Sequence, residues 1–215
     1  MTKLFLFDFD GTLVDSAPDL IASANYVFER HQKKLISYES GRAIASDGVH
    51  AYLRQRFDQK HDDFASLTEE FLSHYRETIL NNTVLFEGVP EVIEAIKKRN
   101  LLWGIVTNKS RKLTEKVLKF YGLVNHVDIV VCGDDGIDAK PSPDMLIKAS
   151  KNLNIEIEDS LYFGDGLRDI QAAQSAKMKS VLACYGYLKV SDDIDAWGAD
   201  YLINHPNEML TFIAD

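Results

Sequence analysis

Short apolar segments rich in β-branched and aromatic residues recur along the chain, and patterns of helical period separate most of them. The segments cover residues 4–9, 102–107, 128–132, 161–164 and 180–184. Strands of a parallel sheet have this composition because helices cover both faces of the sheet. The alternation of strand and helix patterns therefore predicts an α/β fold built on a parallel sheet.

The helical segments between these strands carry recognisable start and stop signals. Ser110 can cap a helix that Gly122 ends in a left-handed position. Ser142 followed by Pro143 predicts another helix start, since proline is favoured at the first helical position. Pro90 is expected to open a further helix in the same way.

Residues 15–83 interrupt the alternation, because they contain helical patterns and no convincing strand. Apolar residues recur at helical spacing within residues 17–30 and 49–57, and Ser66 with Glu69 forms a capping-box pattern before a third helix. An all-helical insert after the first strand can act as a lid over a site, and the alternative is a helical layer packed permanently on the sheet. The predicted division is a core of residues 1–14 and 84–215 and a helical insert of residues 15–83.

Composition and net charge limit the function classes. With 46% hydrophobic and 27% charged residues, the chain has the composition of a folded globular protein. A net charge of −9, from 33 acidic and 24 basic side chains, gives no general field to attract nucleic acid or an anionic membrane. Apolar runs stay below the roughly 18 residues of a membrane span, and Asp8 interrupts the first run too early for a secretory signal. We therefore expect a cytoplasmic protein with no nucleic-acid or membrane partner, and free thiols at Cys132 and Cys184.

Polar residues gather at the carboxyl ends of the predicted strands, where parallel α/β sheets bind their ligands. Each of these clusters alone is a weak signal, but their order along the chain and their common position predict one shared site. The clusters are Asp8-Phe9-Asp10-Gly11-Thr12, Thr107-Asn108-Lys109, Lys140-Pro141 and Gly164-Asp165-Gly166-Leu167-Arg168-Asp169.

The acidic residues of these clusters need a cation if they meet. Two carboxylates about 5 Å apart repel each other by roughly 3 kcal/mol at an effective dielectric constant near 20. Asp8, Asp10, Asp165 and Asp169 together therefore need a counter-charge, which a bound metal ion and Lys140 would supply. Because all the available ligands are oxygens, a hard ion is predicted, and Mg²⁺ fits a site that also holds a phosphate.

The predicted substrate is a small-molecule phosphate monoester. The metal ion, the Lys140 ammonium group, the Thr107 hydroxyl group and the backbone amides of residues 9–12 can neutralise its charge. Asp8 is then the candidate nucleophile that forms an aspartyl-phosphate, and Asp10 is the candidate acid and base for the leaving group and the water. Further candidates for binding the phosphate or the substrate are Gly11, Thr12, Asn108 and, in a turn between insert helices, Asp47 and Gly48.

The four ordered clusters, with Leu13-Val14-Asp15-Ser16 extending the first, resemble the motifs of the haloacid dehalogenase superfamily, and the resemblance covers the whole chain. It implies a Rossmann-like parallel sheet flanked by helices, with an inserted all-helical cap domain of the type called C1. It also implies that Asp8 is the nucleophile and Asp10 the acid and base of a phosphatase. Mg²⁺ would then be held by Asp8, the backbone carbonyl of Asp10 and Asp165, while Asp169 would support the metal shell or Lys140.

Within this superfamily the chain is similar to two related groups of phosphatases. The phosphoglycolate phosphatases are matched by Val14-Asp15-Ser16-Ala17-Pro18-Asp19-Leu20, Gly133-Asp134-Asp135 and Tyr185-Gly186-Tyr187. A resemblance to the N-acetylmuramic acid 6-phosphate phosphatases is favoured by two other stretches, Gly166-Leu167-Arg168-Asp169-Ile170 and Trp197-Gly198-Ala199-Asp200. The chain departs from residues that are frequent in the family at Phe9, Ser110 and Gly166. These departures affect the fine geometry of the site more than the type of reaction.

Other functions are compatible with parts of this pattern. A dehalogenase would not need Asp10, because it has no phosphate leaving group to protonate. A phosphomutase resembling β-phosphoglucomutase uses the same nucleophile and differs mainly in keeping water out. A phosphorylated signalling receiver, which is not an enzyme, groups similar residues in another chain order and lacks an insert. The sequence leaves open the identity of the metabolite and the choice between a monomer and a homodimer.

Overall fold

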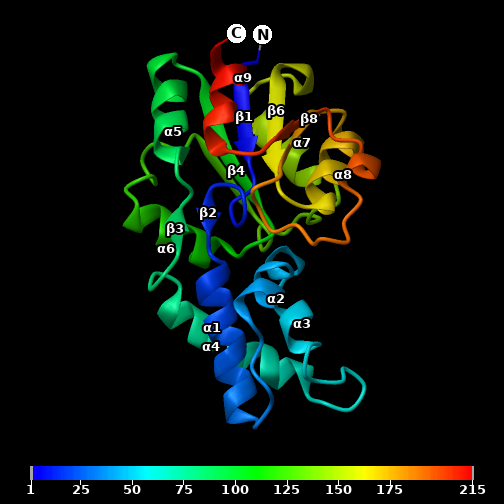
Figure 1. Ribbon diagram of the computed structural model, residues 1–215. Helices are drawn as coiled ribbons and strands as arrows, with labels where there is room; N and C mark the ends of the chain where they lie inside the picture. Colours follow the sequence, from blue (N-terminus) through cyan, green and yellow to red (C-terminus); the bar gives the residue numbers. More distant parts are fainter. Residues whose placement is uncertain (1, 215) are drawn as a thin grey trace.

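Six parallel strands form the central sheet, in the order β5-β4-β1-β6-β7-β8. The computed structural model describes residues 2–214, and Figure 1 shows the sheet in the upper part of the molecule. The five predicted strands are confirmed, with ends that move by at most two residues, and a sixth strand follows them. The strands are β1 (Leu4–Phe7), β4 (Leu102–Thr107), β5 (Ile129–Cys132), β6 (Ser160–Gly164), β7 (Lys179–Ala183) and β8 (Tyr201–Ile203).

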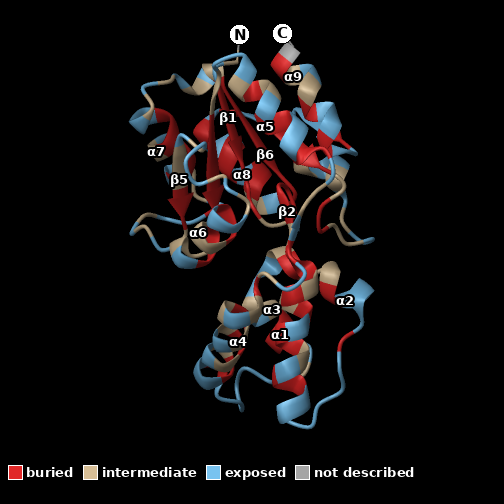
Figure 2. Ribbon diagram, turned by 90° about the vertical axis from the view of Figure 1, so that its left-hand side faces the viewer, coloured by how far each residue is buried: buried red, intermediate tan, exposed pale blue. Residues whose placement is uncertain are grey.

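Side chains of the central strand alternate between the two faces of the sheet. Phe5 and Phe7 belong to one buried cluster, and Leu4 and Leu6 belong to another. Figure 2 shows the buried strands between layers of helices. The predicted Rossmann-like sheet with helices on both faces is therefore confirmed. The first cluster includes residues of α5 (Val89–Lys98), α6 (Arg111–Phe120) and α9 (Leu210–Ala214), and the second includes residues of α7 (Asp144–Asn152) and α8 (Leu167–Ala176).

A helical insert leaves and re-enters the core through a narrow ribbon. β2 (Val14–Asp15) and β3 (Val84–Leu85) pair in antiparallel orientation, so the two connections lie side by side. Figure 1 shows the inserted helices below the sheet, beyond the carboxyl ends of its strands. We call residues 15–83 the cap, and this boundary stays a prediction. The cap contains α1 (Ala17–Arg30), α2 (Tyr38–Arg42), α3 (Val49–Leu53), α4 (Phe64–Thr78) and a 3₁₀ turn at Ala45–Asp47.

Several predicted helix signals are confirmed. α1 spans the predicted residues 17–30, and Pro90 lies in the first turn of α5. Gly122 has a φ of 67°, the left-handed conformation expected after the end of α6. Ser110 is the N-cap of α6, although its side chain makes no capping hydrogen bond.

Two predicted helix starts are wrong, and a third helix is shorter than expected. Ser66 lies inside α4, because the Asp63 carboxylate caps this helix by accepting a hydrogen bond from the Ser66 amide at 3.1 Å. Pro143 is the N-cap of α7, so this helix begins at Asp144, one residue later than predicted. α3 ends at Leu53, where the pattern predicted a helix as far as residue 57.

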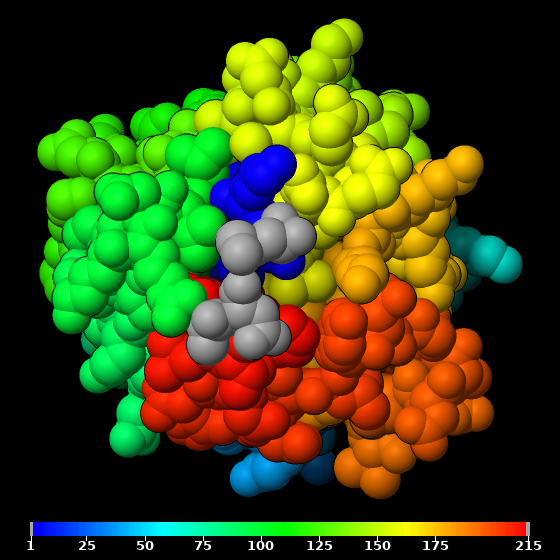
Figure 3. Space-filling view, turned by 90° about the horizontal axis from the view of Figure 1, so that it is seen from above, coloured from blue at the N-terminus to red at the C-terminus, as the bar shows by residue number. Residues whose placement is uncertain are grey.

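The end of the molecule opposite the cap carries both chain ends. Seen from that end, the first residues lie between segments from the middle and from the C-terminal part of the chain (Figure 3). This follows from the central place of β1 in the sheet. The carboxyl ends of the strands, at the other end of the sheet, therefore face the cap.

Two expectations from composition can be compared with this fold. Cys132 and Cys184 are free thiols, as predicted. Among residues 2–214, no helix combines the length and the hydropathy that are needed to cross a bilayer.

Candidate active site

Three aspartates from two strand ends meet in the interior of the protein. Asp8 follows β1, Asp165 follows β6, and Asp169 lies in the first turn of α8. One carboxylate oxygen of each lies within 4.8 Å of the others, and all three residues are buried. The structure thus brings together three of the four aspartates that the sequence assigned to one site.

Lys140 supplies a buried positive charge to this cluster. Its Nζ lies 2.9 Å from Oδ1 of Asp8 and 2.6 Å from Oδ1 of Asp169, and it donates a hydrogen bond to the Tyr162 hydroxyl at 2.8 Å. Asn108 positions the backbone of this lysine: its amide nitrogen donates to the Lys140 carbonyl at 2.9 Å, and its amide oxygen accepts from the Lys140 amide at 3.0 Å. Both polar atoms of the Asn108 side chain are therefore engaged, and its predicted contact with substrate stays a prediction.

Burial and neighbouring charges act differently on the three carboxyl groups. Burial raises the pKa of Asp8, and the Lys140 ammonium group opposes the rise. Burial raises the pKa of Asp165 to about 7, and the charges of Asp169 and Asp8 add to the rise. Burial acts in the same direction on Asp169, but Lys140 and Arg168 outweigh it and lower the pKa of this carboxyl group.

The cluster fits a hard divalent cation. Oδ1 of Asp165 is buried without a hydrogen-bond partner, although Oδ2 accepts hydrogen bonds from the Ser46 hydroxyl at 2.9 Å and the Tyr187 amide at 2.8 Å. An unpaired buried carboxylate oxygen beside two more carboxylates is costly without a positive charge. Since these donors are oxygens, they suit a hard divalent ion better than a thiolate-binding metal.

The Asp10 carboxylate lies apart from the other three. Lys109 Nζ bonds both of its oxygens, at 2.8 and 3.0 Å, and the Ser16 hydroxyl donates to it at 2.5 Å. The sequence placed this side chain with Asp8, Asp165 and Asp169, and the structure separates it because Lys109 compensates its charge elsewhere. A role for the Asp10 backbone carbonyl as a metal ligand stays a prediction.

The turn after β1 explains the glycine of the first motif. Gly11 has a φ of 85°, and a Cβ at this position would lie 2.2 Å from Oδ2 of Asp165. Only glycine therefore lets the turn approach this carboxylate. Thr12 is fully buried and its hydroxyl has no hydrogen-bond partner, while the Thr107 hydroxyl accepts from the Lys109 amide at 3.2 Å.

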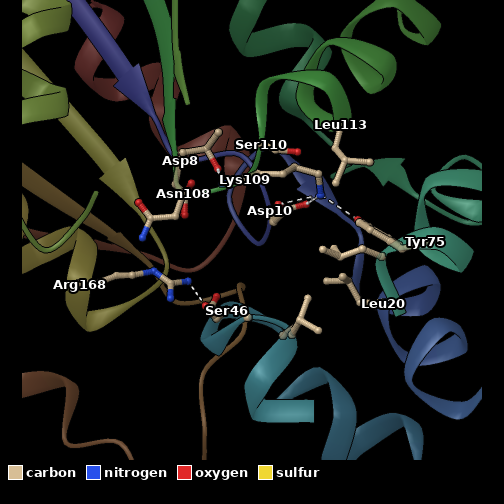
Figure 4. A pocket seen from close by; sticks show the side chains of 15 residues that line it. Asp8, Asp10, Leu20, Ser46, Tyr75, Asn108, Lys109, Ser110, Leu113 and Arg168 are labelled. Carbon is tan, nitrogen blue, oxygen red and sulfur yellow. Dashed lines mark hydrogen bonds and ion pairs between the residues drawn. The ribbon is translucent and has the colours of Figure 1, made fainter. Parts of the chain in front are cut away.

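A cavity of about 300 Å³ lies between the core and the cap. Figure 4 shows Asp8, Asp10 and Asn108 on its core side and Leu20, Ser46 and Tyr75 on its cap side. Gly48 lines the cavity, and its predicted contact with substrate stays a prediction. Asp47 is not part of the lining, because its carboxylate pairs with Lys189 of the core at 2.7 Å.

Comparison with known proteins identifies the family. The model for haloacid dehalogenase-like hydrolases matches residues 5–183. The chain belongs to this family. An N-acetylmuramic acid 6-phosphate phosphatase from Pseudomonas putida is 36% identical to it, over 96% of this chain and 94% of the relative. A phosphoglycolate phosphatase from Xanthomonas campestris pv. campestris is 35% identical, over 96% of this chain and 94% of the relative.

A solved structure agrees with this assignment. A predicted phosphoglycolate phosphatase from Haemophilus somnus superimposes with a TM-score of 0.87 at 25% identity, covering 98% of this chain and 97% of that one. The superfamily and the enzyme class that the sequence predicted, a phosphatase with a haloacid dehalogenase fold, are confirmed.

In this haloacid dehalogenase-like hydrolase the cap touches the core through polar groups whose partners the sequence did not predict. Ser46 bonds Asp165 and accepts a hydrogen bond at its carbonyl from Arg168, and Tyr75 of α4 lies 2.8 Å from Lys109 Nζ. Arg42 donates to the carbonyls of Tyr185 and Gly186 at 2.8 Å each, while Tyr162 holds Lys140 from within the core. Lys109 and Arg168 lie inside recognised clusters, and Ser46 belongs to the turn of residues 46–48 that the sequence singled out. Arg42, Tyr75 and Tyr162 gave no signal.

Proposed function

We propose that this chain is a magnesium-dependent phosphomonoesterase that works through an aspartyl-phosphate on Asp8. The observation that carries the proposal is the separation of two aspartates that lie two residues apart. Asp8 lies in the buried cluster with Lys140 2.9 Å away, whereas Asp10 faces the cavity paired with Lys109 at 2.8 Å. One carboxylate is thus available for attack beside the cation site, and the other for proton transfer.

Mg²⁺ is the proposed cofactor. Asp8, Asp165 and the backbone carbonyl of Asp10 would hold it, and Asp169 would support it or Lys140. When bound, the ion would neutralise part of the charge on the substrate phosphate. The oxygen-only donor set and the unpaired Oδ1 of Asp165 support this assignment.

The proposed reaction has two displacements at phosphorus. A carboxylate oxygen of Asp8 attacks the phosphorus, the bond to the ester oxygen breaks, and Asp10 gives a proton to the leaving alkoxide. Asp10 then removes a proton from a water molecule that attacks the same phosphorus, so the bond to Asp8 breaks and inorganic phosphate leaves. Lys140, the Thr107 hydroxyl and the amides of the turn at residues 9–12 would hold the phosphate oxygens throughout.

We propose a small phosphorylated metabolite as the substrate, with 2-phosphoglycolate as the first candidate. The cavity of about 300 Å³ and the 35% identity to the Xanthomonas phosphoglycolate phosphatase support it. N-acetylmuramic acid 6-phosphate is the second candidate, because the Pseudomonas phosphatase named for that compound is 36% identical.

We further propose that the enzyme acts in the cytoplasm on a free small molecule, as a monomer or a homodimer. Two free cysteines accord with a reducing compartment. The net charge of −9 offers no general attraction for a nucleic acid.

The test is a panel of phosphate monoesters assayed with Mg²⁺ and with a chelator. It should contain 2-phosphoglycolate, N-acetylmuramate 6-phosphate, hexose phosphates and p-nitrophenyl phosphate. We expect multiple turnover that the chelator abolishes and that needs no sugar bisphosphate. Turnover only in the presence of a bisphosphate would indicate a phosphomutase instead, and an absence of turnover on the whole panel would refute the proposal.

A further inference from the structure

Arg168 is a cation of the cavity with hydrogen-bond donors to spare. It lies in the first turn of α8, and Figure 4 shows its guanidinium group extending into the cavity between Asn108 and Ser46. Nη2 donates to the Ser46 carbonyl. Nε is buried without a hydrogen-bond partner, and among residues 2–214 the guanidinium group forms no ion pair.

The other two cations at this site are fully engaged. Lys140 contacts Asp8, Asp169 and Tyr162 within 2.9 Å. Lys109 contacts both oxygens of Asp10 and the Tyr75 hydroxyl within 3.0 Å. Arg168 is therefore the positive group that can accept a new anionic partner without giving up an ion pair.

The surroundings of Arg168 indicate which part of a substrate it would meet. A phosphoryl group must approach Asp8, beside Lys140, whereas the Arg168 guanidinium group contacts the Ser46 carbonyl on the cap side of the cavity. The rest of the cap side is lined mainly by apolar side chains, among them Leu20, Val49 and Leu72, and by Tyr75, whose hydroxyl bonds Lys109. A leaving alcohol enclosed there would meet these apolar side chains, the Asp10–Lys109 pair and Arg168, a cation without an ion-pair partner among residues 2–214.

The geometry points to Arg168 as the residue that binds a carboxylate on the leaving alcohol. The substrate class would then be phosphate esters of hydroxy acids, in preference to esters of neutral alcohols. The planar fork of a guanidinium group matches a carboxylate, and a carboxylate in a cavity that already contains Asp8 and Asp10 needs such a partner. Both 2-phosphoglycolate and N-acetylmuramic acid 6-phosphate carry a carboxylate on the alcohol part. This inference rests on the proposed function and narrows it to a substrate class.

The first test compares matched ligands on the unmodified enzyme. We expect kcat/KM for 2-phosphoglycolate to exceed that for 2-hydroxyethyl phosphate by about 30-fold, the range of a hydrogen bond to a charged group. By calorimetry, the non-hydrolysable 3-phosphonopropionate should bind correspondingly more tightly than propylphosphonate. Ratios near one in both comparisons would overturn the inference.

The second test assigns the preference to Arg168. In Arg168→Gln the preference for the carboxylate substrate should fall to about threefold or less, and Arg168→Lys should keep part of it because the charge remains. Arg30→Gln is the matched control, since Arg30 is a cap arginine with 61% of its side chain exposed and lies outside the cavity lining. Equal losses on both esters in Arg168→Gln, or an unchanged preference, would refute the assignment.

These tests separate failure of the inference from failure of the proposed function. If the unmodified enzyme hydrolyses p-nitrophenyl phosphate but shows no carboxylate preference, only the inference fails. If it hydrolyses no ester at all, the proposed function fails, and the difference in phosphonate binding between the unmodified chain and Arg168→Gln still decides whether Arg168 binds a carboxylate.

Discussion

Ser46 of the cap donates a hydrogen bond from its hydroxyl group to Oδ2 of Asp165 in the core, at 2.9 Å. The Ser46 carbonyl accepts a hydrogen bond from Arg168, so both polar groups of this cap residue meet the core at the cavity. The other oxygen of Asp165 is the one without a partner. The position of the cap and the charge state of the proposed metal site are therefore linked through one carboxylate.

Replacing Asp8 with asparagine should lower kcat by about 1,000-fold or more, because an amide oxygen is a poor nucleophile. The groups that act together with the nucleophile contribute little once it is removed. The variant should stay folded, since asparagine has the same shape and relieves a buried anion whose pKa is raised. Turnover of p-nitrophenyl phosphate and thermal unfolding are the measurements. Asp195→Asn, an exposed carboxylate in the C-terminal part of the core, is the control. Turnover that survives in Asp8→Asn would rule out this nucleophile.

The stability of the metal-free protein should fall as pH rises from about 4 to about 7. Asp165 has a pKa raised from 3.8 to about 7 in the folded state, so in this window the folded chain binds a proton that the unfolded chain has lost. Stability is therefore highest below the unfolded pKa and declines as the buried carboxyl group is forced to ionise. In Asp165→Asn this decline in stability should be smaller. Some dependence of stability on pH should remain, because the pKa of Asp8 is also raised.

Added Mg²⁺ should reverse this trend. A cation binds the deprotonated carboxylate, so its stabilising effect should grow with pH over the same window and be much reduced in Asp165→Asn. Unfolding temperatures measured between pH 5 and 8, with Mg²⁺ and with a chelator, test both statements. A metal-free protein that gains stability between pH 5 and 7 would contradict the predicted fall in stability with rising pH.

Tyr162→Phe should show how far the position of the Lys140 ammonium group depends on the Tyr162 hydroxyl group. The Tyr162 hydroxyl lies 2.8 Å from Lys140 Nζ and 3.0 Å from Oδ1 of Asp169, and it is fully buried. Loss of this hydroxyl should cost about 1–2 kcal/mol of unfolding free energy and lower kcat by about tenfold. Tyr201→Phe is the matched control, because Tyr201 is exposed at the sheet edge. A variant with wild-type kcat would show that Asp8 and Asp169 suffice to hold the lysine.

The buried cluster could be predicted from sequence because the fold itself gathers it. The carboxyl ends of neighbouring parallel strands share one edge, and β1 pairs with both β4 and β6. Asp8 and Asp165 follow two of these paired strands, so a correct strand assignment brings them together. Lys140 joins them through a loop whose backbone Asn108 holds.

The partners of these residues could not be predicted, because they depend on how the cap sits on the core. Tyr75 reaches Lys109 across 34 positions, and Ser46 reaches Asp165 across 119. Neither contact leaves a local pattern in the chain. The start of α4 was missed for a local reason: Asp63 and Ser66 both offer a side-chain cap, and the Asp63 carboxylate accepts the amide bond.

Exchange of Asp47 should affect the enzyme through Lys189 and not through the leaving group. The two side chains pair at 2.7 Å across the cap–core boundary and are 42% and 39% exposed. Such a pair contributes at most about 1 kcal/mol, so Asp47→Asn and Lys189→Gln should each raise KM by no more than about fivefold and to the same extent for every ester. Added salt should reduce both effects, and the double variant should lose little more than either single one. KM and kcat on 2-phosphoglycolate and 2-hydroxyethyl phosphate at low and high salt provide the measurement. A change in substrate preference in Asp47→Asn that Lys189→Gln does not share would instead support the substrate-binding role that the sequence predicted for Asp47.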